Sequence, residues 1–167
     1  IELKQEMERD GNIFQTTSDS EVLLHLIARS RAKDFETSLS QALERLRGAF
    51  SVVLLTEKAI YAIRDPLGFR PLSLARLRDG WCVASETCAF DINEAEYLRD
   101  VEPGEIVRID EDGPVTLHRM ESPRQAACIF ELIYFARPDS IVFGENVDRF
   151  RRSLGRPSAS RGYQLSG

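Results

Sequence analysis

The chain has 167 residues, of which 43% are hydrophobic and 29% are charged, and its formal net charge is −5. This length and composition predict one globular domain and leave no room for a second full one. Acidic and basic residues are interspersed, so no contiguous basic face is available for nucleic acid phosphates. The apolar runs are far shorter than the ~20 residues that a membrane-spanning helix needs. We therefore expect neither nucleic acid nor a membrane as a partner.

The sequence contains three cysteines, Cys82, Cys88 and Cys128, and no hydrophobic secretory segment. An odd number of cysteines in a chain of this size argues for a reducing compartment rather than for a disulfide framework. We therefore expect a cytoplasmic protein.

The first part of the chain has helical spacing. Residues 1–9 resemble the middle of an amphipathic helix without an N-cap of its own, which predicts that the chain begins inside a domain. Gly11 ends this helix, because glycine tolerates the left-handed conformation. Ser18 and Glu21 fit a capping box at the start of a second helix. A third helix is predicted over residues 36–47 from its apolar face.

After residue 48 the pattern changes to short β-prone runs separated by turn residues. A short helix near residues 87–92 interrupts the strands, and a further helix begins at Glu145. Helices followed by a meander of antiparallel strands are an α+β pattern. The predicted strands cover residues 49–56, 59–63, 72–75, 81–84, 105–109 and 115–118.

Four segments together resemble a known family: Ile13–Val22, Arg64–Leu72, Ala84–Asp91 and Cys128–Ser140. Each alone has a simple structural explanation, such as a turn or a helix start. In this order and at this spacing they resemble the amidophosphoribosyltransferases over residues 1–155. Other class II glutamine amidotransferases, including glucosamine-6-phosphate synthase and asparagine synthetase, loosely share the first two segments. The last two segments are more specific to the amidophosphoribosyltransferases.

The resemblance implies an N-terminal-nucleophile hydrolase fold, in which two antiparallel sheets stack between helical layers in an αββα arrangement. The predicted meander agrees with it. Residues 1–144 would be a partial class II glutamine amidotransferase domain, incomplete at the N-terminus. Residues 145–167 would begin the connection toward a phosphoribosyltransferase domain and end in an irregular tail.

This family attacks glutamine with the thiolate of an N-terminal cysteine, whose free amine is the base, while an Asn-Gly pair donates to the oxyanion. The ammonia then displaces pyrophosphate from phosphoribosyl pyrophosphate in the first step of purine synthesis. Here position 1 is isoleucine, and Gly11-Asn12 has the reverse order and reads as a turn. We therefore expect no catalytic residue in this chain and no glutaminase activity from it alone.

The resemblance gives two residues a ligand role. Asp19 would pair with the α-ammonium of bound glutamine as a charge-assisted acceptor, although the same charge could serve only the helix N-terminus. Cys128 would be one ligand of an iron–sulfur cluster, with three further ligands in the transferase domain. We expect no cofactor in this chain, whereas the whole protein could hold such a cluster and magnesium.

Three arginines of the motifs lie in tight turns near carboxylates and are interpreted as scaffold: Arg64, Arg70 and Arg137. His25 and His118 have no partner in a nucleophile motif, so neither is a catalytic candidate.

Two other interpretations stay open. The chain could be a complete, non-enzymatic glutamine-binding module, which the upstream reading frame would decide. It could also belong to another class II amidotransferase, such as glucosamine-6-phosphate synthase, but the string Tyr134–Ser140 counts against that. Under the preferred interpretation the partners are glutamine and, through the transferase domain, phosphoribosyl pyrophosphate, and the whole protein is a homo-oligomer.

Overall fold

The computed structural model describes residues 2–122 and 124–155. The chain divides into two compact units, Ile1–Gly48 and Ala49–Gly167. In the described part, no helix combines the length and the apolar character needed to cross a membrane. The expected tail beyond Gly155 lies outside the described residues.

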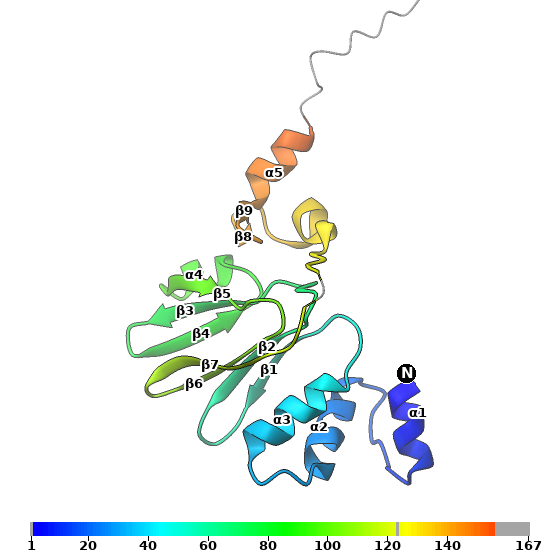
Figure 1. The fold of residues 1–167 in the computed structure, drawn as a ribbon. Coiled ribbons are helices and arrows are strands. Elements are labelled where there is room, and N and C mark those ends of the chain that lie inside the picture. The colour runs from blue at the N-terminus through cyan, green and yellow to red at the C-terminus, as the bar shows by residue number, and fades with distance from the viewer. Residues whose placement is uncertain (1, 123, 156–167) are drawn as a thin grey trace, which may run out of the picture. The chain divides into compact units, whose positions relative to one another are not determined.

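The first unit is helical, as predicted, and consists of α1 (Glu2–Arg9), α2 (Ser20–Arg29) and α3 (Phe35–Glu44) (Figure 1). Gly11 ends α1 with a φ of +86°, and the Asn12 amide donates to the Met7 carbonyl at 3.0 Å. The prediction that Gly11-Asn12 is a turn is therefore confirmed. Helices α2 and α3 pack on each other, and they bury apolar side chains at helical spacing: Val22, Leu23, Leu26, Leu39, Ala42 and Leu43.

The starts of these two helices differ. Helix α3 has a side-chain cap, because the Asp34 carboxylate accepts from the Thr37 amide at 2.8 Å. The capping box predicted for α2 is wrong: the residue at its N-cap is Asp19, which makes no side-chain cap hydrogen bond. Glu21 does not reach back to Ser18, because its carboxylate accepts hydrogen bonds from Gln15 and Thr16 in the preceding loop.

The second unit contains two antiparallel sheets. The first has the order β1 (Ser51–Leu55), β2 (Ile60–Arg64), β6 (Glu105–Asp110) and β7 (Gly113–Arg119). The second has the order β4 (Gly80–Ala84), β3 (Ser73–Leu77) and β5 (Glu96–Asp100). The short helix α4 (Cys88–Ile92) lies between β4 and β5 in the chain, as predicted. The pattern missed only β5 among these strands.

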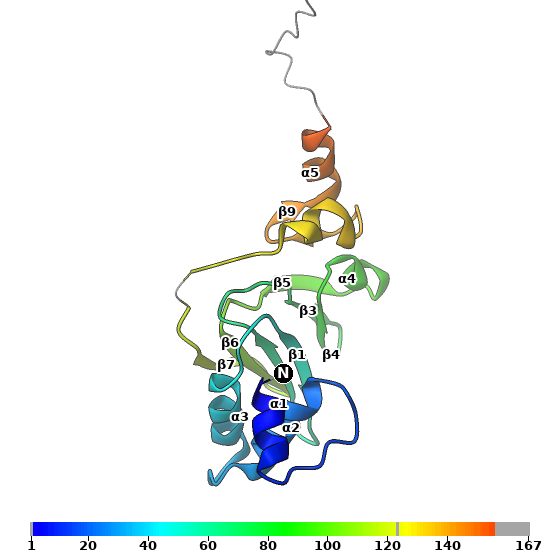
Figure 2. The same ribbon diagram turned by 90° about the vertical axis from the view of Figure 1, so that its right-hand side faces the viewer.

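The two sheets lie beside each other (Figure 1 and Figure 2). They share one apolar core. Alternate residues of a strand point to the same face, so β2 and β6 direct one face of their sheet toward side chains from β3 and β4. The core consists of Ala62, Leu72, Leu74, Val101, Val107 and Ile109, with Ile60, Trp81 and Val83 packed against it. The predicted α+β class with two antiparallel sheets is thus confirmed.

The end of the described chain contains the π-helix η1 (Glu131–Phe135), the hairpin β8 (Ile141–Val142) and β9 (Glu145–Asn146), and α5 (Val147–Leu154). A small core of Leu132, Ala136, Val142 and Val147 joins them, with Phe143 and Phe150 at its edge. The expected domain boundary between residues 144 and 145 falls inside this hairpin, and it stays a prediction.

Candidate functional site

Asp19 lies at the point where the loop 12–18 enters α2. Its backbone is already helical, with φ −71° and ψ −24°, and its carbonyl accepts from the Val22 amide at 3.1 Å. Its side chain is exposed, and among residues 2–122 and 124–155 it has neither a hydrogen bond nor an ion pair. Asp19 therefore makes no side-chain cap hydrogen bond, although its charge lies at the N-terminus of α2, and its carboxylate is available to a cationic ligand.

Glu21, two residues further on, holds the loop in front of Asp19. One carboxylate oxygen accepts from the Gln15 amide at 2.8 Å, and the other accepts from the Thr16 amide at 2.9 Å. The second oxygen also accepts from the Thr16 hydroxyl at 2.7 Å. The sequence analysis assigned Glu21 to a capping box and missed this role. The sequence feature that could have indicated this role is an acidic residue in the first helical turn after a run of polar loop residues.

These hydrogen bonds change the acidity of Glu21. The Gln15 amide contributes most, the Thr16 hydroxyl and amide add to it, and nearby His25 contributes a smaller attraction; together they lower the pKa of Glu21 from 4.5 to about 2. Burial acts in the opposite direction and is outweighed. Glu21 is therefore ionised at any physiological pH, and the imidazole of His25 lies 3.6 Å from its carboxylate.

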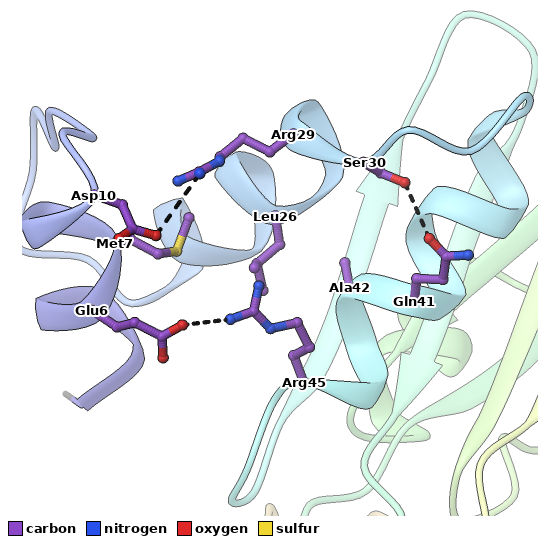
Figure 3. Close-up of a pocket in the computed structure, with 9 residues that line it drawn as sticks. All are labelled: Glu6, Met7, Asp10, Leu26, Arg29, Ser30, Gln41, Ala42 and Arg45. Carbon is purple, nitrogen blue, oxygen red and sulfur yellow. Dashed lines mark hydrogen bonds and ion pairs between the residues drawn. The ribbon is translucent and has the colours of Figure 1, made fainter.

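The helices of the first unit also enclose a hollow of about 280 Å³, to which α1, α2 and α3 all contribute (Figure 3). Its polar side chains are paired with one another: Glu6 with Arg45 at 3.0 Å and Asp10 with Arg29 at 3.9 Å. Asp19 is not among its lining residues. The hollow therefore differs from the predicted glutamine site, and its charges are already neutralised.

Cys128 is buried and lies in the second unit, just before η1. Its amide donates to the Phe69 carbonyl at 3.0 Å, which fixes the backbone there. Among the described residues no group of three or more His, Cys, Asp or Glu side chains could hold a metal ion. The described residues therefore do not gather the four thiolates that normally hold an iron–sulfur cluster around Cys128. The ligand role of Cys128 stays a prediction.

The other two cysteines lie in regular structure, Cys82 on β4 and Cys88 in α4, as expected. All three thiols are free. His25 lies in α2 and His118 on β7. Asp19 and Cys128 belong to different compact units, and each has its own surroundings.

The turn after β2 is fixed by two buried charged residues. The Asp65 carboxylate accepts from the amides of Leu67 at 2.9 Å and Phe69 at 3.1 Å. The Arg64 guanidinium donates to three carbonyls, those of Gly68, Arg70 and Val101. Arg64 thus makes the contacts of a scaffold residue.

A second set of contacts fixes residues 137–141. The Glu86 carboxylate accepts from the Arg137 amide at 2.7 Å and from the Ser140 hydroxyl at 3.0 Å. The hydroxyl of Thr87 accepts from the Ile141 amide at 2.8 Å. Two of the resembling segments, Ala84–Asp91 and Cys128–Ser140, are therefore in direct contact.

Comparison with known proteins gives the same result as the motifs. A family model described as a glutamine amidotransferase domain matches residues 1–91, which is more than half of the chain. The chain is 49% identical to the chloroplastic amidophosphoribosyltransferase 2 of Arabidopsis thaliana over 154 residues, which cover 92% of this chain and 28% of that protein. It is 44% identical to the amidophosphoribosyltransferase of Bacillus subtilis, covering 93% of this chain and 33% of that one.

Solved structures agree with this comparison. The glutamine phosphoribosylpyrophosphate amidotransferase of B. subtilis, complexed with ADP and GMP, matches 92% of this chain with a TM-score of 0.89 and 44% identity, and the match covers 34% of that chain. A structure described as the allosteric regulatory enzyme of purine biosynthesis matches with a TM-score of 0.88. These matches confirm the expected N-terminal-nucleophile hydrolase fold. The chain spans about a third of the length of these relatives, and it belongs to the glutamine amidotransferase domain family.

Proposed function

We propose that this chain is the glutamine-handling part of an amidophosphoribosyltransferase. The protein would hydrolyse glutamine, and the ammonia would displace pyrophosphate from phosphoribosyl pyrophosphate to give 5-phosphoribosylamine. The observation that carries the proposal is the match to the B. subtilis amidotransferase over 92% of this chain at 44% identity. The string Tyr134–Ser140, in which the Arg137 amide and the Ser140 hydroxyl donate to Glu86, supports the purine enzyme over amidotransferases that use other acceptors.

Within this function we assign Asp19 to glutamine binding. A carboxylate that is exposed and has no partner in the described part of the chain can pair with an ammonium group without first breaking another interaction. A charge-assisted hydrogen bond of this kind contributes about 1.5–3 kcal/mol.

The test compares two nitrogen donors on the protein as its gene produces it. Pyrophosphate release from phosphoribosyl pyrophosphate is measured with glutamine and, separately, with ammonia. We expect Asp19→Asn to lower kcat/KM for glutamine about tenfold or more, because the paired charge is lost. The ammonia-dependent rate should stay unchanged, because free ammonia does not need the α-ammonium contact.

Two results would contradict the proposal. If neither donor releases pyrophosphate, the protein does not use phosphoribosyl pyrophosphate as its acceptor. The protein is then a glutamine-binding module or another amidotransferase. If Asp19→Asn lowers both rates equally, the effect lies in folding rather than in glutamine recognition.

Three further features of the whole protein also remain proposals. They are its cytoplasmic location, its homo-oligomeric state, and an iron–sulfur cluster that includes Cys128. The free cysteines support a reducing compartment, and the Arabidopsis relative is described as chloroplastic.

A further inference from the structure

The loop in front of α2 is tied down mainly at Thr16. Its amide and its hydroxyl both donate to Glu21, and its carbonyl accepts from the Lys4 ammonium at 2.9 Å. Its hydroxyl oxygen in turn accepts from the Ser18 amide at 3.2 Å. The amide, the carbonyl and the hydroxyl of Thr16 thus all form hydrogen bonds. Two of the four hydrogen bonds go to Glu21, and a third is accepted by the hydroxyl that Glu21 orients.

The ring of Phe14 adds an apolar contact to this arrangement. It lies edge-on to the His25 imidazole at 4.6 Å between ring centroids, and the Lys4 ammonium lies 4.8 Å from the centre of the Phe14 ring. Side chains of both α1 and α2 therefore contact the loop: Lys4 from α1, and Glu21 and His25 from α2. The loop is held from both helices.

The consequence concerns Asp19, which follows this loop directly. Its own side chain makes no hydrogen bond to the helix, so the backbone fixes only where the side chain starts, and thereby the region that the carboxylate can reach. That backbone is fixed after Asp19 by α2 and before Asp19 by the hydrogen bonds of Glu21. A backbone segment that is ordered before binding leaves less conformational entropy to be lost when the ligand arrives.

We infer that Glu21 is a positioning residue for glutamine binding, which acts by holding the loop 14–18 so that Asp19 faces the α-ammonium of the substrate. This inference rests on the proposed role of Asp19. Glu21 itself touches no substrate. Its function needs both carboxylate oxygens, because they accept three hydrogen bonds from two loop residues.

The experiment measures the dissociation constant of L-glutamine by calorimetry on the protein as its gene produces it, with Glu21→Gln as the main variant. This side chain keeps its length but replaces one acceptor oxygen with an NH₂ group that faces a donor. We expect binding about tenfold weaker. Binding of glutaramate, which is glutamine without its α-amino group, should change less than twofold, because Glu21 acts only through the ammonium contact.

Two matched controls separate positioning from general stability. Asp34→Asn removes a carboxylate that accepts two hydrogen bonds from Thr37 in the same unit, away from the loop, and glutamine binding should stay within twofold. Thr16→Ser keeps the hydroxyl donor and should bind glutamine normally, whereas Thr16→Val removes it and should weaken binding severalfold. Hydrogen exchange of the Gln15 and Thr16 amides should accelerate in Glu21→Gln.

The outcomes distinguish this inference from the proposed function. If the unchanged protein binds glutamine, Asp19→Asn weakens it and Glu21→Gln does not, then Glu21 has no positioning role. If Glu21→Gln weakens glutamine and glutaramate equally, its role is structural only, and the inference is again overturned. If the unchanged protein binds no glutamine, the proposed function fails and the inference fails with it.

Discussion

At the scale of single residues, the molecule uses buried carboxylates to fix backbone segments. Glu105 is fully buried, and it accepts from both terminal nitrogens of Arg99, at 2.7 and 3.0 Å. It also accepts from the Glu102 amide at 2.8 Å and from the Thr116 hydroxyl. Arg119 approaches it to 3.8 Å but is 62% exposed. The sequence places Glu105 on a strand, but its spacing does not reveal that this glutamate points inward.

Replacing Glu105 tests this arrangement. In Glu105→Gln the guanidinium of Arg99 loses its charged partner, and we expect the free energy of unfolding to fall by about 2 kcal/mol or more. Arg99 is 35% exposed and can be partly rehydrated, which keeps the loss below that of a fully buried pair. The matched variant Arg119→Gln should cost no more than about 0.5 kcal/mol. Equal losses of the two variants in urea unfolding would contradict the conclusion that Glu105 stabilises the fold mainly through partners other than Arg119.

The same carboxylate makes stability depend on pH. Burial raises the pKa of Glu105, but the hydrogen bonds from Arg99, Thr116 and the Glu102 amide outweigh it, so the pKa lies below the ordinary 4.5. A lowered native pKa stabilises the fold above about pH 4.5, and this stabilisation is lost as the pH falls through the native pKa. Between pH 7 and pH 3, Glu105→Gln should therefore lose less stability than the unchanged protein; a loss of the same size would contradict this assignment.

At the scale of elements, periodicity predicted the helices α1 to α5 and six of the strands of the two sheets within a few residues. It missed β5, because three of its five residues, Glu96, Arg99 and Asp100, are charged, and no alternation marks it. This strand exists because of its pairing with β3, where Ser73 lies opposite Asp100 and their side chains are 2.7 Å apart. Pairing between distant segments is a tertiary effect that local propensity does not encode.

The start of α5 offers an element-scale test. The Asn146 side chain accepts from the Arg149 amide at 3.0 Å and so caps the helix. We expect Asn146→Ala to lower the free energy of unfolding by about 1 kcal/mol, and Asn146→Asp to have little effect because it keeps the acceptor. Thermal unfolding of the two variants measures the difference. If alanine and aspartate behaved alike, the hydrogen bond would make no contribution.

At the scale of the whole molecule, the order and spacing of four motifs predicted the family and the two-sheet fold, and the comparisons confirm both. The site was predicted less completely. Asp19 could be named from its motif, but the motif suggested a capping box around it. The role of Glu21 depends on how the loop folds back over the first turn of α2, and that geometry follows from Thr16, Lys4 and Phe14 together rather than from any single spacing.

The claim that Asp19 pairs with the α-ammonium of glutamine is tested by the dissociation constant of L-glutamine for the unchanged protein and for Asp19→Asn. Losing a charge-assisted hydrogen bond should weaken binding about tenfold to a hundredfold, with the melting temperature nearly unchanged because Asp19 is exposed and has no cap hydrogen bond. Equal dissociation constants for the two proteins would contradict the claim.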